Sequence, residues 1–229
     1  MKLSINALRK EGSAIKLIRM NLKNPFSFLP GQSISINVHN LEKNIINQKR
    51  YYSLVSSPTQ KDYLELLVKD NPTSLVAHYL YENLAVGEEL DIEGPYGKLC
   101  LTQEHAPLTF IAGGSGIAPF ISMIRYALSK NLSVPLTLFY STKRIDEAAF
   151  YDELQELDKE HKLTYIHTLT QDPLWKGNKG RLTKDFLSQH LPVLQGFFFI
   201  CGSQEMIKDT SRALKELGVQ EEAIIIEKY

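Results

Sequence analysis

Four short segments of the chain carry groups that could do chemistry: RYYS at Arg50–Ser53, GPYG at Gly94–Gly97, GGSGIAP at Gly113–Pro119 and CGS at Cys201–Ser203. They offer cations, aromatic rings, hydroxyls, open glycine backbone and a thiol, in a chain that ends on Tyr229. Each segment alone is a modest signal. Their order along the chain suggests two cofactor sites in succession, and therefore electron transfer.

The glycine-rich segment follows the apolar run LTFIAG and precedes an apolar pattern typical of a helix. Gly113, Gly114, Ser115 and Gly116 would let the backbone approach a pyrophosphate, whose charge a helix N-terminus favours. Pro119 suits a first helical turn, where its missing N–H costs nothing. The alternative is a tight strand-to-helix turn that holds no ligand.

A cationic segment follows the next expected strand, VPLTLFY. It contains Ser141, Lys143 and Arg144 where an NAD-binding unit would place an acid for the ribose hydroxyls. Two cations and nearby hydroxyls complement a 2′-phosphate, so we expect a slight preference for NADPH over NADH. A solvated basic loop is the alternative.

Cys201 and Gly202 end the apolar run FFFIC at the same expected edge of a sheet. A lone cysteine in this position is usually a small buried residue. The alternative is a thiol that lies against a nicotinamide ring.

The bulk composition excludes several classes of function. Lys plus Arg and Asp plus Glu number 26 each, so no basic excess favours a nucleic-acid partner. With 2 Cys and 6 scattered His, an iron–sulfur cluster or a structural zinc site is not expected. No apolar run approaches the roughly 20 residues of a membrane span, and the first residues do not resemble a signal peptide. We expect a cytoplasmic protein.

The elements that position these segments change character along the chain. In the first part, QSISINV and YLELLVK alternate apolar and polar residues as half-buried strands do, with one helix expected around Leu75–Leu84. An antiparallel β-barrel would close such strands. After Gln103, strands alternate with helices, which predicts an α/β doubly wound parallel sheet of five strands. We therefore expect two domains, residues 1–103 and 104–229.

These motifs, in this order, make the chain resemble the ferredoxin–NADP reductase superfamily over nearly its whole length. Arg50, Tyr52 and Ser53 match the family's Arg-x-Tyr-Ser signature, and Gly94–Gly97 matches its Gly-Pro-x-Gly turn. Gly113–Pro119 and Cys201-Gly202 match two further family motifs. The resemblance implies FAD as the cofactor and NADP(H) or NAD(H) as the co-substrate.

The resemblance also implies roles for single residues. Arg50 would neutralise the FAD pyrophosphate, Tyr52 would lie against the flavin or its ribityl chain, and Ser53 would hydrogen-bond near flavin N5. The backbone of Leu67, Val68 and Lys69 would contact the cofactor. Without the resemblance, the two tyrosines would be taken for a strand pair in a barrel core.

The family's carboxyl end is acidic and aromatic, and here Glu227 and Tyr229 resemble it. The ring of Tyr229 would stack on the flavin, although a terminal aromatic residue is often a frayed end. Glu227 would be the carboxylate near the nicotinamide, with Cys201 as its neighbour. Ser53, Cys201, Glu227 and Tyr229 are the expected catalytic set.

The chain departs from the family in two places. The pyrophosphate helix starts with Ser74, Leu75, Val76 and Ala77, so alanine occupies the usual hydroxyl position and the strength of FAD binding is left open. The chain also lacks a cysteine-rich, cluster-binding segment, which implies a separate electron acceptor such as a ferredoxin, a flavodoxin or an oxygenase component.

The sequence thus predicts a flavoprotein NAD(P)H oxidoreductase that passes a hydride to FAD and then electrons to another protein. Two alternatives stay open. One is a reductase of free flavin, for which flavin is a substrate. The other is a non-catalytic electron-transfer subunit of a larger complex. The identity of the acceptor and the oligomeric state do not follow from the sequence.

Overall fold

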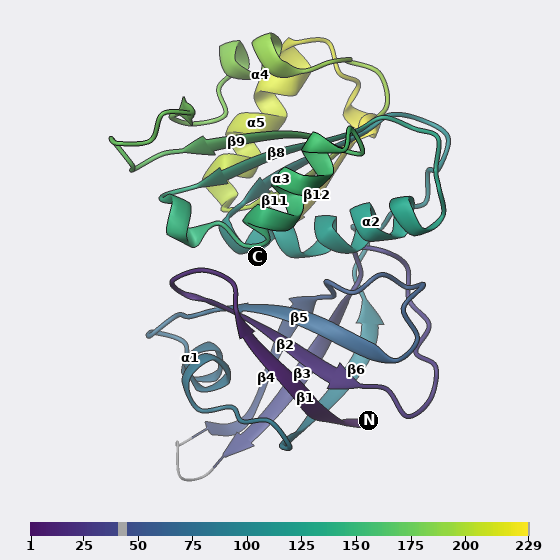
Figure 1. Cartoon of the computed structure of the whole chain (residues 1–229), viewed down its shortest axis with the longest axis vertical. Coiled ribbons are helices and arrows are strands. Elements are labelled where there is room, and N and C mark those ends of the chain that lie inside the picture. The colour runs from purple at the N-terminus through teal and green to yellow at the C-terminus, as the bar shows by residue number, and fades with distance from the viewer. Residues whose placement is uncertain (41–44, 229) are drawn as a thin grey trace.

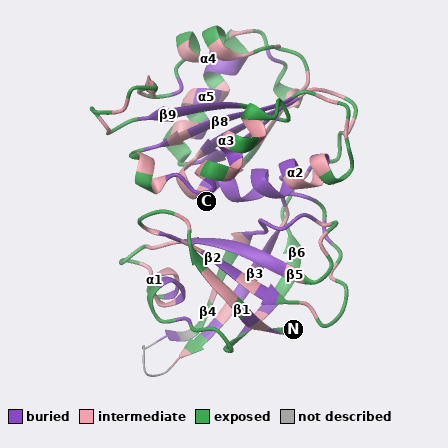
Figure 2. Cartoon of the chain, in the orientation of Figure 1, coloured by how far each residue is buried: buried purple, intermediate pink, exposed green. Residues whose placement is uncertain are grey.

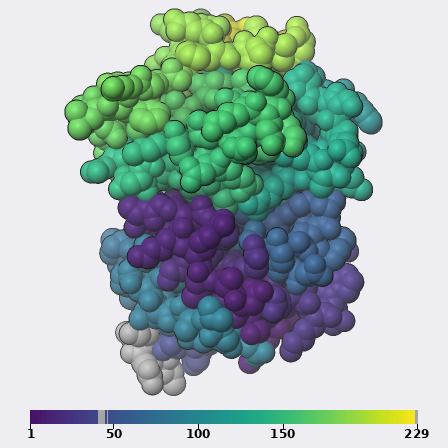
Figure 3. Space-filling model, in the orientation of Figure 1, coloured from purple at the N-terminus to yellow at the C-terminus, as the bar shows by residue number. Residues whose placement is uncertain are grey.

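The computed structural model describes residues 1–40 and 45–228. Within them the chain folds into two layers of structure stacked along the long axis, with the first half of the sequence below and the second half above (Figure 1). On the face seen in the space-filling view, the two halves are packed against each other (Figure 3).

The first half is a six-stranded antiparallel sheet in the order β4-β3-β6-β1-β2-β5. Its elements are β1 (Lys2–Lys10), β2 (Ile15–Asn21), β3 (Ser33–Asn40), β4 (Ile45–Ser53), β5 (Tyr63–Lys69), α1 (Leu75–Glu82) and β6 (Glu89–Tyr96). An antiparallel bridge between Leu54 and Leu66 joins the two outer strands, and the N–H of Val55 donates to the carbonyl of Glu65. The expected barrel is therefore present.

The second half is a six-stranded parallel sheet in the order β10-β9-β8-β7-β11-β12. Its strands are β7 (Leu108–Gly113), β8 (Leu136–Thr142), β9 (Thr164–Leu169), β10 (Asn178–Lys179), β11 (Phe197–Gly202) and β12 (Ile224–Lys228). The five strands predicted from the sequence are all there. The sixth, β10, has only two residues at the edge of the sheet, too few to form an apolar pattern.

Helices cover both faces of this sheet, as a doubly wound fold requires. They are α2 (Ala118–Ser129), α3 (Tyr151–Lys159), α4 (Lys184–His190) and α5 (Gln204–Glu216), with short 3₁₀ turns at Gly114–Ile117, Ile145–Glu147 and Glu221–Ala223. Neighbouring strand residues face opposite sides. Phe110 and Leu138 pack with α2 and α3, whereas Ile111 and Phe139 pack with α4 and α5.

One apolar core crosses the boundary between the halves. Ile15, Leu17, Val55 and Leu67 of the barrel belong to the same buried cluster as Phe120 of α2. Figure 2 shows the buried upper strand of the barrel facing the buried side of α2. The division at residue 103 stays a prediction, but the contact between the halves is apolar and extensive.

Candidate functional site

The strand order places the glycine-rich segment at the switch point of the parallel sheet. β7 lies between β8, which the chain visits next, and β11, to which it later returns. Ligands of open α/β sheets bind at the carboxyl ends of such strands. Gly113–Pro119 begins at the last residue of β7 and Cys201–Ser203 spans the end of β11, so both lie at this edge.

Close backbone packing explains the glycines of this turn. A Cβ on Gly116 would lie 2.4 Å from the carbonyl oxygen of Cys201, and one on Gly113 would lie 2.5 Å from Sδ of Met206. The Cα atom of Gly113 is 3.3 Å from the Cβ position of Gly202. Gly114 has φ of 54°, a conformation that glycine adopts without strain. The chain enters a 3₁₀ turn first, and Pro119 lies in the first turn of α2 as expected.

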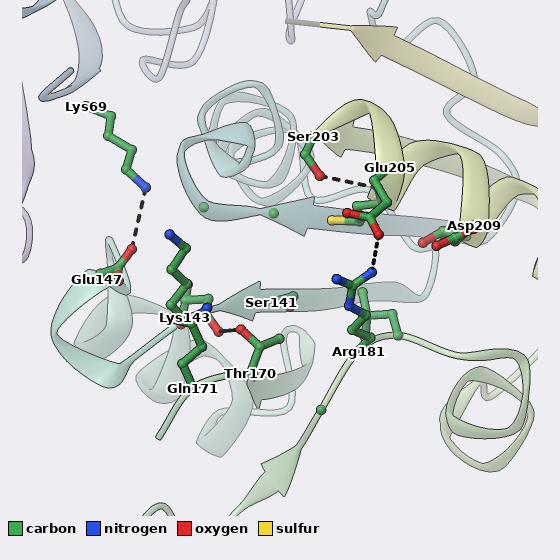
Figure 4. Close-up of a pocket in the computed structure, with 17 residues that line it drawn as sticks. Lys69, Ser141, Lys143, Glu147, Thr170, Gln171, Arg181, Ser203, Glu205 and Asp209 are labelled. Atoms are coloured by element: carbon green, nitrogen blue, oxygen red, sulfur yellow. Dashed lines mark hydrogen bonds and ion pairs between the residues drawn. The ribbon is translucent and has the colours of Figure 1, made fainter. Parts of the chain in front are cut away.

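A cavity of about 470 Å³ opens in front of this turn (Figure 4). Five of the expected site residues line it: Lys69, Gly113, Gly114, Ser141 and Lys143. The other lining residues are Thr142, Glu147, Thr170, Gln171, Gly180, Arg181, Leu182, Ser203, Glu205, Met206, Asp209 and Thr210. Arg144, Gly116, Pro119, Cys201 and Gly202 do not line this cavity, and the guanidinium of Arg144 pairs with Asp146 at 3.3 Å.

Several residues of this cavity escaped the sequence analysis. Arg181 and Glu205 form an ion pair across it, from the loop after β10 and the first turn of α5 (Figure 4). Thr170 and Gln171 follow β9 at the same edge. The local pattern around each is that of an ordinary polar loop, so only the rule that parallel strands end together could have indicated them.

A second cavity, of about 510 Å³, lies on the barrel side. Of the residues predicted from the family resemblance, Arg50, Tyr52, Ser53, Leu67, Lys69, Ser74, Ala77 and Ser115 line it. The remaining lining residues are Tyr51, Asp70, Asn71 and Ala118. The two cavities adjoin, since Lys69 lines both and the neighbours Gly114 and Ser115 line one each.

The side chains of three residues predicted to hold FAD point away from this cavity, and the contacts expected of their backbone stay a prediction. Val68 and Val76 are buried in the barrel core, and Leu75 is an exposed residue of α1 outside the cavity wall. Alternation along β5 places Leu67 and Lys69 on the cavity side and Val68 on the other. At the helix start, Ser74 caps α1 by accepting the N–H of Ala77 at 3.4 Å.

Ser53 and Glu227 are brought together from opposite ends of the sequence. Glu227 lies on β12 beside Cys201 of β11, and its side chain reaches the barrel, where it is hydrogen-bonded to Ser53. Burial raises the pKa of the Glu227 carboxyl, and the Ser53 hydrogen bond opposes that rise. The Oε2 atom of Glu227 is buried with no hydrogen-bond partner among the residues described here.

Cys201 itself is 0% exposed and packs in the apolar cluster of the second half. Its expected place beside the nicotinamide stays a prediction. Tyr229 lies outside the described residues. Burial raises the pKa of Tyr52 to about 12, partly offset by Arg50, so its hydroxyl keeps its proton at neutral pH.

These side chains fit the groups that the sequence implied. Arg50 and the N-terminus of α1 offer positive charge for a pyrophosphate, and Tyr52 offers an aromatic face. A second phosphorylated ligand could bind at the glycine turn, where Ser141 offers a hydroxyl and Lys143 a positive charge. Among residues 1–40 and 45–228, no group of three or more His, Cys, Asp or Glu is placed to hold a metal ion.

A barrel and a doubly wound sheet with adjoining phosphate-binding cavities define a two-domain oxidoreductase that binds a flavin and a nicotinamide nucleotide. The family models agree. Residues 2–100 match the oxidoreductase FAD-binding domain and residues 110–212 match the oxidoreductase NAD-binding domain. The chain belongs to the ferredoxin–NADP reductase superfamily, and FAD and NAD(P)(H) are the ligands of its two domains.

Curated relatives share about a quarter of the sequence. One relative is the ferredoxin–NAD(P)⁺ reductase component of the naphthalene 1,2-dioxygenase system of Pseudomonas putida. It is 25% identical over 100% of this chain and 69% of its own length. A flavohemoprotein of Bacillus cereus is 26% identical over 86% of this chain and 52% of its own length. The chain thus spans between about half and about two thirds of these relatives.

Solved structures share the fold. The flavohem-like FAD/NAD-binding domain of nitric oxide dioxygenase from Vibrio cholerae superposes with a TM-score of 0.92 at 21% identity, covering 100% of this chain and 98% of that one. A ferredoxin NADP⁺ reductase from Neisseria gonorrhoeae, with FAD and NADP bound, gives a TM-score of 0.80 at 22% identity and the same coverage. Within the described part of our chain, no helix is both long and apolar enough to cross a membrane.

Proposed function

We propose that this chain is an NAD(P)H-oxidising flavoprotein reductase that passes a hydride from the nicotinamide to FAD and then electrons to a separate acceptor protein. The observation that carries the proposal is the meeting of the two cavities, with Lys69 in both walls and Ser53 paired with Glu227 across the boundary. Bound FAD would supply the conversion of a two-electron donor into one-electron transfers.

The side chains of the barrel cavity would bind and orient the flavin cofactor. Arg50 and the first N–H groups of α1 would hold the pyrophosphate, while the backbone of β5 at Leu67 would border the ring system. The Ser53 hydroxyl, which donates to the Glu227 carboxylate in this structure, would turn towards the flavin when FAD is bound. Glu227 would keep a carboxylate beside the nicotinamide.

The residues around the glycine turn would bind the nucleotide. Gly113 and Gly114 leave room for its pyrophosphate, and Ser141 and Lys143 would contact its adenosine end. Lys143 is the cation of this segment that lines the cavity, so we assign it the 2′-phosphate of NADPH. Lys69, paired with Glu147 at 3.5 Å, lies between the two ligands.

The relatives favour an iron–sulfur or haem acceptor. Their names include the reductase component of a dioxygenase system and flavohemoproteins. A ferredoxin or an oxygenase component would therefore be the acceptor, in line with a sequence of 229 residues that contains only 2 Cys.

One observation favours a second function, reduction of free flavin. The cavity wall near the start of α1 carries the carboxylate of Asp70, which pairs with His78 at 2.9 Å. The negative charge of Asp70 and the missing hydroxyl at Ala77 would both lower the affinity for the FAD pyrophosphate. A weakly held flavin would behave as a substrate.

An anaerobic titration of the purified chain tests the two functions. We expect a yellow protein whose visible flavin bands are bleached by NADPH faster than by NADH. A colourless protein that reduces added flavin would instead support the second function. A yellow protein that neither nucleotide bleaches contradicts hydride transfer.

A further inference from the structure

A buried carboxylate lies on the boundary between the two halves, away from the residues discussed so far. Glu65, in the middle of β5, is only 2% exposed. Its Oε1 atom accepts from Nε and Nη2 of Arg19 at 2.9 and 2.7 Å, within the barrel. Its Oε2 atom accepts from Nη1 of Arg125 at 3.0 Å, across the boundary. Both oxygens are therefore used, one for each half of the molecule.

Arg125 extends this contact into the second half. It lies on α2, and its Nε and Nη2 atoms donate to the two carboxylate oxygens of Glu153 on α3, at 2.9 and 2.7 Å. We call the four residues Arg19, Glu65, Arg125 and Glu153 the interdomain clasp. It joins β2 and β5 of the barrel to α2 and α3 through charge-assisted hydrogen bonds. The Arg125–Glu153 pair is bidentate, and the bond across the boundary is the single one from Nη1 of Arg125 to Oε2 of Glu65.

Aromatic rings hold both arginines in place. The guanidinium carbon of Arg19 is 4.1 Å from the ring centroid of Tyr63, and that of Arg125 is 5.3 Å from the centroid of Phe150. These contacts restrict the side-chain rotamers from which the hydrogen bonds are made.

Hydrogen bonds beside the clasp fix the same two elements. The hydroxyl of Ser122 on α2 donates to the carbonyl of Ser56 at 2.8 Å, and the Ser56 hydroxyl accepts the N–H of Glu65 at 3.2 Å. The arrangement is therefore continuous from β5 through the loop after β4 to α2.

The clasp shares its elements with the cofactor cavities but lies outside their walls. Ala118 at the start of α2 and Leu67 on β5 line the barrel cavity, whereas Arg125 and Glu65 line a separate polar recess of about 230 Å³. Arg125 is seven positions along α2 from Ala118, about 10 Å at the rise of an α-helix. A rotation of α2 against β5 at the clasp would therefore move the glycine turn relative to the barrel.

The energetics suggest a role other than stability. Replacing a buried ion network by apolar residues of similar size is often neutral or stabilising, so such a network is weak support for a stable fold. The apolar contact already holds the halves together, but apolar packing has no preferred direction. Hydrogen bonds do have a preferred direction. Glu153 holds the Arg125 guanidinium by two bonds, and the third bond, to Glu65, can then fix one angle between the halves.

We propose that Glu65 and Arg125 are positioning residues, which fix the orientation of the nucleotide half on the barrel and thereby the alignment of the two cofactors. This inference rests on the proposed function for its kinetic consequence only. Hydride transfer requires reacting atoms about 3–3.5 Å apart, and a misplacement of about 1 Å can cost roughly 100-fold in rate.

The kinetic test compares variants by stopped-flow reduction of the bound flavin at saturating NADPH. The triple variant Arg19→Met/Glu65→Leu/Arg125→Met removes the directional bonds and keeps the volume, so it is expected to fold. We expect its rate constant to fall between about 10- and 100-fold with little change in KM, because no clasp residue lines a cofactor cavity. Arg125→Lys keeps the charge without the fork and should recover part of the rate.

The matched control is Lys215→Met. It removes the exposed ion pair between Lys215 on α5 and Glu221 in the next 3₁₀ turn, and it should leave the rate constant unchanged. If the triple variant does not fold, Arg125→Lys alone decides, with a loss of rate supporting the proposal and an unchanged rate overturning it.

A distance measurement tests the orientation without any cofactor. Spin labels are attached at Glu89→Cys on β6 and Gln189→Cys on α4, both exposed positions, in a Cys100→Ala background. Electron–electron double resonance should give a narrow distance distribution with the clasp and a broader one in the triple variant. A narrow distribution or an unchanged rate constant in that variant overturns the proposal. If NADPH does not reduce the flavin of the protein with an intact clasp, the proposed function fails. The spin-label distances still show whether the clasp fixes the orientation of the two halves.

Discussion

Glu227 makes a polar contact between the two halves of the molecule. It belongs to the last strand of the parallel sheet, yet its carboxylate is hydrogen-bonded to Ser53 of the barrel. Its second oxygen is buried and, within the described residues, has no hydrogen-bond partner. A carboxylate held in this way favours a ring that gains positive charge, as a nicotinamide does when it loses a hydride.

Glu227→Gln should therefore impair the reaction without harming the fold. The amide keeps the shape but not the charge, and we expect the rate constant for flavin reduction to fall on the order of 100-fold. Because burial raises the pKa of Glu227, the wild-type rate should decline as the pH falls through a value above 4.5, and the variant should show no such decline.

Stability provides the control for this substitution. A raised carboxyl pKa means that the folded state resists ionisation, so the charged Glu227 lowers the free energy of unfolding at neutral pH. The glutamine variant should be at least as stable as the wild type by urea denaturation at pH 8. A destabilised variant would show that its slow turnover has a structural cause.

Lys143 should determine the preference for NADPH. It lines the nucleotide cavity, whereas Arg144 pairs with Asp146. Lys143→Ala should raise the KM for NADPH about tenfold, because a charge-assisted hydrogen bond is lost. The KM for NADH should change by less than about twofold. Arg144→Ala is the matched comparison and should have the smaller effect in steady-state assays. Equal effects on both nucleotides would exclude contact with a 2′-phosphate.

Sequence patterns indicated the residues that follow one another in a motif. Arg50, Tyr52 and Ser53 lie within four consecutive residues of β4, so a local signature describes them, and they line one cavity. Arg181, Glu205 and the side chain of Lys69 reach the nucleotide cavity from three separate elements. Nothing in the sequence links such residues until the fold brings them together.

At the scale of elements, the start of α1 is the place where this chain departs from its family. Ser74 is engaged as the helix cap, and Ala77 presents a methyl group to the cavity. Ala77→Ser should add one hydrogen bond to the FAD pyrophosphate, worth about 1 kcal/mol, and tighten FAD binding about fivefold. Quenching of FAD fluorescence on titration with apoprotein measures the dissociation constant.

A serine elsewhere on α1 is the control for this substitution. Leu75→Ser changes a residue that is 57% exposed and outside the cavity wall, so the affinity for FAD should stay the same. If both variants tighten binding equally, the effect comes from the helix and not from a hydroxyl at position 77.

The elements themselves were largely predictable from periodicity. The sequence of β3 alternates apolar and polar residues, and α5 carries its buried residues on one face. The exceptions are short: the two-residue β10 and the 3₁₀ turn at Gly114–Ile117 contain too few residues for a period to develop. The spacing of Phe150, Leu154 and Leu157 predicts one helix that contains all three. Phe150 instead has φ of 58° just before α3, where Glu11 of the barrel accepts its N–H at 3.1 Å.

For the molecule as a whole, a buried histidine should make stability depend on pH. His167 on β9 is stacked between Tyr140 and Tyr165, and burial lowers its pKa to about 4 from 6.5. Unfolding restores the ordinary pKa, so the unfolded chain binds the proton more readily between these values. The free energy of unfolding should therefore fall as the pH drops below 6.5, by at most about 3 kcal/mol near pH 4.

Urea denaturation between pH 4 and pH 8 measures this dependence. His167→Gln keeps an amide that can hydrogen-bond Thr142, the present partner of Nε2, and removes the titrating group. The variant should be less stable at pH 8 but should lose less stability towards pH 4. A parallel decline in both proteins would assign the effect to other groups.

The apolar core shared by the two halves has a consequence for how the protein is made. During synthesis the barrel leaves the ribosome first, and Ile15, Leu17, Val55 and Leu67 then lack the α2 residues that cover them. An uncovered apolar surface of this kind invites aggregation. We therefore expect a chain ending at residue 103 to depend on chaperones and to precipitate when purified alone, so that neither half could be exchanged in evolution without a matching surface on the other.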